Sequence, residues 1–421
     1  MKTIACRLYG KNDFRMEEFQ LPEIKENEIL AKVISDSLCM SSYKAASLGA
    51  DHKRIPNDIA ENPVILGHEF CGEIIKVGSA CKDKYKAGAK FSIQPAMNHP
   101  SNVYAAPGYS FCNIGGDATY VIIPTETLEM DCLLDYNGEA YFYGSLAEPM
   151  SCVIGAFHAS YHMDPGSYVH KMGIKPNGKC AILAGVGPMG LGAVDYALHG
   201  PVRPSLLVVT DIDDKRLERA ASLYTVEDAA KDGIRLVYLN TAAPDSTDKL
   251  MALTDGKGYD DVFVFAPVKP VVEQADSILG MDGCLNFFAG PTNPEFSANF
   301  NFYNVHYAST HVCGTSGGNT DDMREALALM EKKVINPAAM VTHIGGLNAA
   351  CETTLNLPKI PGGKKLIYTH KNIPLTAIDD FAQEGETSPF FKALAEIVAK
   401  HNGLWCEEAE AYLLANAPDI Y

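Results

Sequence analysis

Short runs of alternating apolar and polar residues dominate the first third of the chain. They lie at residues 28–35, 71–80, 89–95 and 118–124, and glycine, proline and asparagine separate them. This pattern is typical of strands that bury one face. We therefore predict an irregular, mostly antiparallel β domain up to about residue 135.

The pattern changes from about residue 145, where apolar residues begin to recur at helical spacing. Six apolar, β-like runs then alternate with helical stretches, at residues 180–185, 206–211, 235–239, 261–266, 284–290 and 307–314. Such alternation predicts a parallel sheet covered by helices on both faces. A helix over 322–333, a β segment over 364–370 and helices after Asn372 complete the expected elements.

These patterns predict an α/β chain with two domains and a C-terminal extension. The β-rich domain is expected over residues 1–163 and the parallel-sheet domain over 164–318. Residues 319–371 are expected to return to the first domain, and residues 372–421 to form a helical extension. A length of 421 residues is ample for two or three domains of ordinary size.

The charge and the cysteine content of the chain indicate which binding partners and which cellular compartment to expect. Lysine and arginine number 35 against 52 aspartate and glutamate residues, a formal charge of −17, so we expect no nucleic-acid or membrane partner. We see neither a signal peptide nor an apolar run long enough to span a membrane. The twelve cysteines are scattered without a CxxC pair, which favours reduced thiols and a cytoplasmic protein.

A glycine-rich turn follows the first strand of the expected parallel sheet and precedes a helix. Its G-x-G-x-x-G spacing is typical of dinucleotide binding, because the backbone can approach a pyrophosphate at the helix N-terminus. An ordinary glycine turn is the alternative interpretation. The residues expected to contact the cofactor in this turn are Gly185, Gly187, Pro188, Met189 and Gly190.

Two charged residues bear on which dinucleotide binds. Asp211 ends the second strand, 21 residues after Gly190, where an acid meets the ribose hydroxyls of the cofactor. A carboxylate there favours NAD(H), because it would repel the 2′-phosphate of NADP(H). Arg216 leaves NADP(H) open, since a guanidinium can pair with that phosphate, although it is equally well explained as a surface charge.

Three separated groups offer metal-ligand atoms. They are Cys39, the pair His68 and Glu69, and Glu148. Zinc takes thiolate, imidazole and carboxylate ligands, and a catalytic zinc site keeps one position open for substrate. Singly, a core cysteine, a surface His–Glu pair and a helix cap explain these residues equally well. Their combination with a dinucleotide site favours one catalytic zinc ion.

The order of these motifs resembles the zinc-containing medium-chain dehydrogenase/reductase superfamily over roughly residues 1–370. The resemblance implies a GroES-like catalytic domain and a doubly wound Rossmann domain. It also implies a catalytic zinc on Cys39, His68 and Glu148, with Glu69 as an alternate or nearby ligand. The motifs that carry it are Cys39, Gly67-His68-Glu69-x-x-Gly72, Gly115-Gly116-x-Ala118-x-Tyr120, Glu148-Pro149 and Gly185-x-Gly187-x-x-Gly190.

The chain also departs from the pattern of that superfamily. Many relatives carry four cysteines for a structural zinc, but the matching stretch here has only Cys112, so we predict no structural zinc. Ser41 keeps the hydroxyl that relatives place against the substrate oxygen, and it is expected to donate or relay the proton. Ser42 replaces an acid that backs the ligand histidine, and Lys44 falls where relatives often have a proton-relay histidine.

The chain resembles one branch of the superfamily more closely, the L-sorbose 1-phosphate reductases. The stretches CMSSYK, SGGNTDDM and LPKIPGGKKLIYTH and the helical tail carry this resemblance. It implies reduction of L-sorbose 1-phosphate to D-glucitol 6-phosphate by hydride from a nicotinamide cofactor. A phosphate requires cations in so acidic a protein, and Lys44 and the run His52-Lys53-Arg54 are the candidates. A solvated basic loop is the alternative.

Other interpretations remain open at this point. The chain is alternatively a dehydrogenase of free polyols or secondary alcohols, similar to sorbitol or threonine dehydrogenase. It is alternatively a zinc-free relative similar to quinone reductases, or a nucleotide-binding protein without catalysis. Relatives are usually dimers or tetramers, so we expect a homo-oligomer that acts on a small molecule.

Overall fold

The computed structural model describes all 421 residues and divides into two compact units. Unit 1 comprises Met1–Pro149, Asn319–Glu331 and Val341–Tyr421. Unit 2 comprises Met150–Gly318 and Lys332–Met340. The first change of unit therefore falls at Pro149, inside a helix, whereas the sequence pattern placed it at residue 163. No helix combines the length and apolar character that a membrane span needs.

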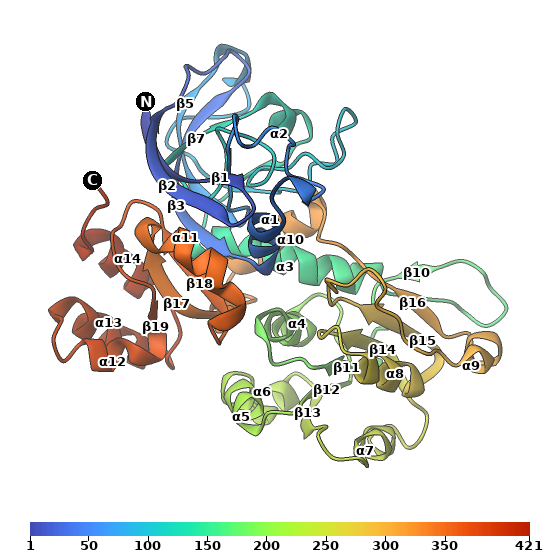
Figure 1. Cartoon of the computed structure of the whole chain (residues 1–421). Coiled ribbons are helices and arrows are strands. Elements are labelled where there is room, and N and C mark those ends of the chain that lie inside the picture. Colours follow the sequence, from blue (N-terminus) through green and yellow to red (C-terminus); the bar gives the residue numbers. More distant parts are fainter. The chain divides into compact units, whose positions relative to one another are not determined.

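Unit 1 contains two β-sheets (Figure 1). The strands of the larger sheet are β3 (Ile29–Leu38), β5 (Phe70–Val77), β6 (Lys90–Ile93), β7 (Tyr120–Ile123), β8 (Leu133–Asp135), β17 (Val341–Gly346), β18 (Lys364–Tyr368) and β19 (Thr376–Ala377). Their order is β19-β17-β18-β3-β5-β6-β8, with β7 also paired to β3. The smaller sheet, in the order β2-β1-β4, consists of β1 (Lys2–Gly10), β2 (Asp13–Gln20) and β4 (Val64–Ile65).

All strand pairs of unit 1 are antiparallel except β17 with β18, as expected for a β-rich catalytic domain. Helices pack around these sheets, and the last three of them form the C-terminal extension. The helices are α1 (Met40–Leu48), α2 (Thr125–Glu129), α3 (Tyr141–Ala159, which continues into unit 2), α10 (Thr320–Glu331), α11 (Leu347–Asn356), α12 (Phe381–Glu384), α13 (Pro389–Lys400) and α14 (Glu407–Asn416). Short 3-10 turns are η1 (Gly49–Asp51), η2 (Ser79–Cys81), η4 (Leu357–Lys359) and η5 (Ile378–Asp380).

Unit 2 is a six-stranded parallel sheet. Its strands are β11 (Lys179–Leu183), β12 (Leu206–Asp211), β13 (Arg235–Asn240), β14 (Tyr259–Val264), β15 (Leu279–Phe287) and β16 (His311–Cys313). The order β13-β12-β11-β14-β15-β16 is that of a dinucleotide-binding Rossmann fold. Most residues of the central strands are buried, which explains their continuous apolar runs.

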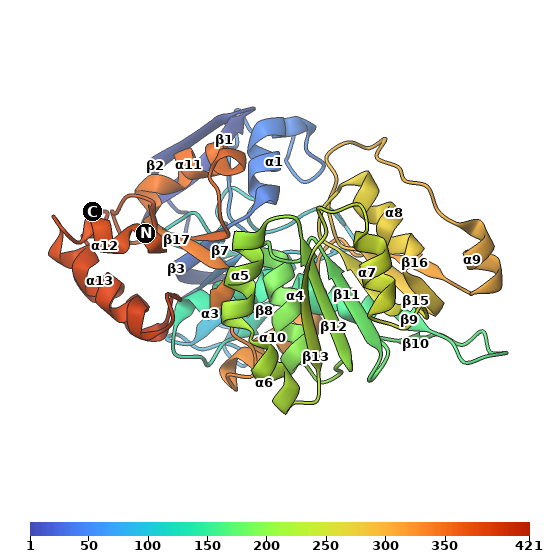
Figure 2. The ribbon, with the colours of Figure 1, turned by 90° about the horizontal axis from the view of Figure 1, so that it is seen from below.

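Helices cover both faces of this sheet, which confirms the predicted fold class. Figure 2 shows α4, α5 and α6 on one face and α7 and α8 on the other. The helices of unit 2 are α4 (Pro188–His199), α5 (Asp214–Leu223), α6 (Val226–Lys231), α7 (Ser246–Ala252), α8 (Lys269–Ser277), α9 (Phe302–Tyr307) and the 3-10 turn η3 (Pro337–Met340). A two-stranded hairpin of β9 (Tyr161–His162) and β10 (Lys171–Met172) completes the unit.

The last strand of the parallel sheet is shorter than its apolar run. The sequence pattern placed it over residues 307–314, but Tyr307 ends α9 and pairing with β15 begins only at His311. The Asn301 side chain caps α9 by accepting a hydrogen bond from the Tyr303 N–H. This cap begins a helix that ends at Tyr307, a residue that the apolar pattern had assigned to the strand.

The C-terminal extension holds the first turn of α3. Glu410 of α14 is 2% exposed, and its carboxylate accepts hydrogen bonds from the Tyr141 and Phe142 N–H groups at 2.5 and 2.8 Å. It also accepts from the Tyr368 hydroxyl at 2.8 Å, which in turn accepts from the Trp405 indole. The carboxylate thus satisfies helix N–H groups that otherwise lack partners.

We expect Glu410→Ala to lower the free energy of unfolding by about 2–4 kcal/mol, because buried donors would be left without an acceptor. Urea denaturation at pH 7 measures this. Glu408→Ala provides the control, since Glu408 lies on the same helix and is exposed, and we expect a change within about 0.5 kcal/mol. Equal small effects of both variants would contradict the capping role.

Burial raises the pKa of Glu410 to about 7, against the lowering effect of its hydrogen-bond donors. The unfolded chain releases this proton near the ordinary value of 4.5, so the folded state binds more protons between these values. Stability conferred by Glu410 should therefore fall as the pH rises from about 4.5 to 7, and level off above. The free energy of unfolding of the natural protein should therefore fall more steeply with pH across this range than that of Glu410→Gln, which carries no titrating group at this position. Denaturation of both proteins across this range measures this, and parallel pH curves would contradict it.

Candidate active site

Cys39 lies where strand β3 ends and helix α1 begins. It is the N-cap residue of α1, and its sulfur accepts a hydrogen bond from the Ser41 N–H at 3.5 Å. Burial raises the pKa of Cys39 to about 12, and the nearby Lys364 charge opposes that effect. A metal ion would deprotonate such a thiol, because a coordinating thiol binds as the thiolate.

His68 follows Gly67, whose backbone conformation only glycine can adopt here. Gly67 has a φ of 89°, and a Cβ there would lie 2.4 Å from a carboxylate oxygen of Asp36. The His68 ring is buried between two hydroxyl groups, with Ser42 Oγ 3.2 Å from Nδ1 and Tyr109 Oη 3.2 Å from Nε2. Burial lowers the pKa of His68, which keeps the ring neutral as a metal ligand requires.

The structure brings Cys39, His68 and Glu69 together. One ligand atom from each of the three lies within 4.8 Å of the others. The buried carboxylate of Glu69 is also bound by the Lys364 ammonium, which contacts both of its oxygens, one at 2.6 Å. Burial lowers the pKa of Lys364, but the charges of Glu69, Cys39 and Glu148 and the hydrogen bond to Glu69 together outweigh that effect and raise it. Lys364 therefore stays charged and neutralises Glu69.

Glu148 lies inside α3 rather than at its N-terminus, so its alternative role as a helix cap does not apply. It is not part of the group of three ligand atoms described above. The negative charge of Glu148 nevertheless reaches this group of ligands, because it raises the pKa of both Cys39 and Lys364. Pro149 follows within the helix and removes one backbone donor at this point.

Two residues of this site were missed by the sequence analysis, Tyr109 and Lys364. Each is buried, at 4% and 6% exposure. Lys364 begins the apolar strand β18, and a charged residue in a strand that is buried throughout was the signal available for it. Tyr109 lies in an irregular segment, and nothing in the sequence around it indicated contact with His68.

The basic residues predicted to bind a phosphate gather beside Tyr109. The His52 ring stacks on the Tyr109 ring with centroids 5.8 Å apart, and the Arg54 guanidinium lies 5.3 Å from the same centroid. Besides burial, the charges of Arg54, Lys53 and Lys44 lower the pKa of His52, so these four residues share one region. Arg54 also lowers the pKa of His68, which places its charge within reach of the candidate ligands.

A surface pocket of about 320 Å³ adjoins this basic region. Lys53 and Arg54 line one part of it, and His99, Ser101 and Ser110 contribute polar groups. Ser110 is fixed there by donating a hydrogen bond to the Arg54 carbonyl at 2.7 Å. The pocket offers charged and polar donors of the kind that bind a phosphate.

The glycine turn of unit 2 opens helix α4 as the sequence predicts. Gly187 is the N-cap residue, Pro188 occupies the first helical position and Met189 follows it. A Cβ on Gly190 would lie 2.3 Å from the Gly185 carbonyl oxygen, so close packing requires glycine there. The helix N-terminus is thereby left open for a pyrophosphate.

The positive φ at this turn belongs to Ala184, at 54°, and not to one of the three glycines of the motif. Gly185 is required for space, because a Cβ there would lie 2.6 Å from Ile182 Cγ2.

Asp211 and Arg216 lie together beside this turn. Asp211 is buried, and its Oδ1 accepts hydrogen bonds from the Ile212 and Asp213 N–H groups at 2.9 and 3.2 Å. An Arg216 nitrogen lies 3.8 Å from that oxygen, and another would lie 3.5 Å from a Cβ placed on Gly187. The carboxylate and the guanidinium thus lie together beside the glycine turn.

Comparison with known proteins places these sites in context. A family model of zinc-binding dehydrogenases matches residues 188–332, and a model of alcohol dehydrogenase GroES-like domains matches residues 25–130. L-sorbose 1-phosphate reductase of Klebsiella pneumoniae is 54% identical over 418 residues, covering 99% of this chain and 98% of that protein. Mannitol-1-phosphate 5-dehydrogenase of Aliivibrio fischeri is 55% identical over 414 residues, covering 98% and 97%.

Solved structures show the same fold. The crystal structure of 2R,3R-butanediol dehydrogenase from Bacillus subtilis matches with a TM-score of 0.69 and 22% identity, over 87% of this chain and 99% of that chain.

Proposed function

This chain belongs to the zinc-binding dehydrogenase family, and we propose that it reduces L-sorbose 1-phosphate to D-glucitol 6-phosphate. Membership and the relatives above make it a zinc-dependent polyol or sugar-phosphate dehydrogenase or reductase with a nicotinamide cofactor. The particular substrate is our proposal. The observation that carries it is the gathering of Lys44, His52, Lys53 and Arg54 beside the candidate zinc ligands in an acidic protein.

We assign Cys39, His68 and Glu148 as the zinc ligands. Thiolate, imidazole and carboxylate are a donor set that suits zinc, and three protein ligands leave a position for substrate. His68 would hold the metal through Nε2, the nitrogen that contacts the Tyr109 hydroxyl in this structure, while Ser42 contacts Nδ1 and fixes the orientation of the ring. Glu69 stays nearby as the partner of Lys364. When bound, zinc supplies Lewis-acid polarisation of the substrate carbonyl and the nicotinamide supplies hydride.

The remaining side chains bind substrate and supply the proton. Ser41 lies in the first turn of α1, two residues after Cys39, so its hydroxyl is assigned to donate a proton to the substrate oxygen as hydride arrives. Lys44, one turn later on the same helix, and Arg54 bind the phosphate by charge-assisted hydrogen bonds.

The basic residues provide the test of the phosphate site. We expect Arg54→Ala to raise the KM for L-sorbose 1-phosphate about 10- to 100-fold, because one charge-assisted hydrogen bond contributes about 1.5–3 kcal/mol. The KM for free L-sorbose should change little. Arg15→Ala is the matched control, since Arg15 also lies over a tyrosine ring, 4.6 Å from the centroid of Tyr9. Equal effects on both sugars would contradict the assignment.

A second substrate is favoured by the 55% identity to a mannitol-1-phosphate 5-dehydrogenase. Oxidation of D-glucitol 6-phosphate and of mannitol 1-phosphate, measured side by side with NAD, separates the two candidates. A kcat/KM at least about tenfold higher for D-glucitol 6-phosphate is the expected result. The reverse order would move the proposal to the mannitol phosphate.

NAD(H) is proposed as the preferred dinucleotide because Asp211 is buried at the end of β12. We expect Asp211→Asn to raise the NADP-to-NAD ratio of kcat/KM about tenfold, since it removes a charge that repels the 2′-phosphate and frees Arg216. Asp214→Asn removes an equal charge three positions later and serves as the control. An unchanged ratio in Asp211→Asn would contradict the role of this carboxylate.

A homo-oligomer, dimer or tetramer, remains a prediction. Large apolar side chains are exposed near the sheet edge formed by β16, which is consistent with a partner there. These side chains are Met281, Phe302, Tyr303, Tyr307 and Val312.

A further inference from the structure

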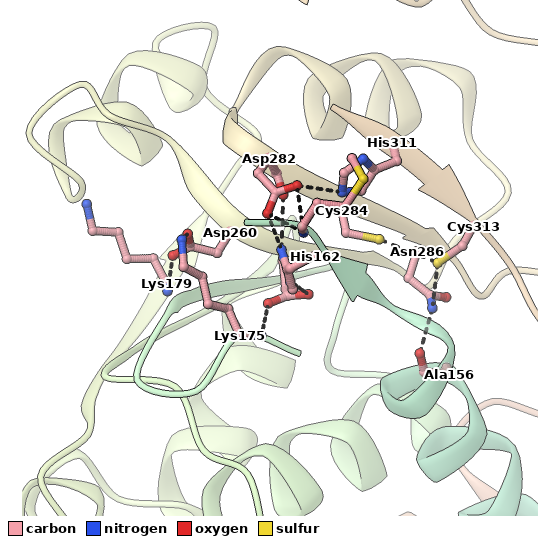
Figure 3. A network of polar contacts seen from close by, with 12 residues as sticks. Ala156, His162, Lys175, Lys179, Asp260, Asp282, Cys284, Asn286, His311 and Cys313 are labelled. Carbon is pink, nitrogen blue, oxygen red and sulfur yellow. Dashed lines mark hydrogen bonds and ion pairs between the residues drawn. The ribbon is translucent and has the colours of Figure 1, made fainter. Parts of the chain in front are cut away.

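Unit 2 contains a cluster of ligand-bearing side chains that the dehydrogenase reaction does not use. His162 of β9, Asp282 of β15 and His311 of β16 offer one ligand atom each, and these atoms lie within 4.8 Å of one another. We call these three residues the histidine cluster. Figure 3 shows the carboxylate of Asp282 between the two imidazole rings.

The distances within the histidine cluster suit a small metal ion. His162 Nδ1 lies 3.4 Å from Asp282 Oδ2 and 3.0 Å from the Asp282 backbone carbonyl oxygen, and His311 Nε2 lies 3.3 Å from Asp282 Oδ1. Ligand atoms about 2.0–2.1 Å from a tetrahedral zinc ion are separated by about 3.3–3.4 Å, so both distances to the carboxylate match. Two imidazoles and one carboxylate are a zinc donor set, and a water molecule can complete it.

Each histidine ring is held by a second contact, as in natural metal sites. His162 Nε2 lies 3.1 Å from the carboxylate of Asp261, which is fixed in turn by the Lys175 N–H at 2.9 Å. A ligand histidine whose other nitrogen donates to a carboxylate is the common arrangement around zinc. The His311 ring stacks on the Tyr161 ring, with centroids 4.4 Å apart, and the Tyr161 backbone also contacts it.

One ligand atom of the cluster lacks a hydrogen bond. His311 Nε2 is buried and forms none, although it lies 3.3 Å from the Asp282 carboxylate. Buried polar atoms are rarely left without a partner, and a bound ion is one of the recognised explanations for such an atom.

The charges nearby also favour a cation. Asp261 and Asp282 both face His162, and Lys175 pairs with a third carboxylate, that of Asp260, at 2.6 Å. With neutral rings, two clustered carboxylates would lack a neutralising charge. A protonated His162 is the alternative source of that charge. Burial lowers the pKa of His162, but the hydrogen bonds and charges of Asp261 and Asp282 together outweigh burial and raise this pKa to about 9. Metal content separates these alternatives.

We propose that the histidine cluster binds a second divalent transition-metal ion, of which zinc fits best, in addition to the zinc of the active site. The ion would connect three segments, the β9–β10 hairpin, strand β15 and the edge strand β16. Its role is structural, because it fastens the hairpin and the last strand of the sheet to their neighbour.

The test is the zinc content per chain of untagged full-length protein, loaded with zinc and dialysed. We expect about two zinc ions in the natural protein, about one in His311→Gln and about one in Cys39→Ala. The double variant should hold none. His170→Gln is the matched control, because His170 stacks on the same Tyr161 ring with centroids 4.3 Å apart but is not in the cluster. It should keep both ions.

Asp282→Asn is a second variant for the case that His311→Gln does not fold. Asn tolerates the positive φ of this position, 58°, and keeps an acceptor for the Met163 N–H. Zinc should raise the unfolding temperature of Cys39→Ala, but not that of Cys39→Ala with Asp282→Asn. One zinc ion in the natural protein, or two in both cluster variants, would overturn the proposal.

Discussion

Replacing Cys39 with alanine should remove about one zinc ion per chain and lower kcat for L-sorbose 1-phosphate by at least about 1000-fold. Lewis-acid stabilisation of the transition state contributes several kcal/mol, and each 1.36 kcal/mol corresponds to a factor of about ten in rate. The sulfur is the only soft ligand in the group that includes His68 and Glu69. Steady-state kinetics and metal analysis on the same preparation measure both effects.

Cys112→Ala is the matched control for this experiment. Cys112 is another partly buried free thiol, and it is the one cysteine in the stretch where relatives carry a structural zinc. We expect its replacement to leave zinc content and kcat unchanged, because one thiolate does not make a closed zinc site. Full activity of zinc-depleted Cys39→Ala would contradict the assigned mechanism.

Replacing Lys364 with methionine should lower the free energy of unfolding by about 3–5 kcal/mol. The Lys364 ammonium and the Glu69 carboxylate are both buried, and removing one partner leaves an uncompensated charge. Denaturation in the presence of a chelator measures the effect without a contribution from zinc. Lys2→Met, which removes an exposed ion pair with Glu18, is the control and should change the free energy of unfolding little.

The double variant Lys364→Met with Glu69→Gln tests whether the stability lost in Lys364→Met comes from the unpaired charge of Glu69. Replacing both members of a buried ion pair with neutral side chains is often far less costly than removing one. We therefore expect the double variant to recover at least about half of the stability lost in Lys364→Met. A double variant as unstable as the single one would show that Lys364 contributes by packing rather than by charge.

Much of the fold could be predicted because each strand carries its own signal. The runs at 206–211 and 261–266 are mostly apolar because they form most of β12 and β14, which helices cover on both faces. The glycine turn was recognisable because close packing at Gly190 and Gly185 admits no side chain. The limits of β16 could not be recognised from the sequence, because the side chain of Asn301 caps α9 and so determines where that helix begins.

The candidate ligands could be named in advance, but the contacts that hold them could not. Cys39 and His68 lie in short motifs whose residues are close in sequence. Lys364, in contrast, reaches Glu69 across 295 positions, and Glu410 caps α3 across 269. Such contacts depend on how the whole unit folds, so no local pattern of residues records them.

The acidic composition is compatible with the proposed phosphate substrate because the basic residues lie together in one region. A net charge of −17 describes the whole chain, whereas Lys53 and Arg54 line one pocket and Lys44 acts on the same neighbour, His52. A local cluster of cations attracts a phosphate at short range even when distant surface charges are negative, because salt screens the latter over about 10 Å.

The most direct test follows NADH absorbance with zinc-loaded and zinc-depleted protein, offered L-sorbose 1-phosphate or free L-sorbose at equal concentration. We predict rapid NADH oxidation only when zinc and the phosphorylated sugar are both present. Equal rates with the two sugars, or turnover that survives zinc removal, would contradict the central claim that this chain is a zinc-dependent reductase of a ketose phosphate.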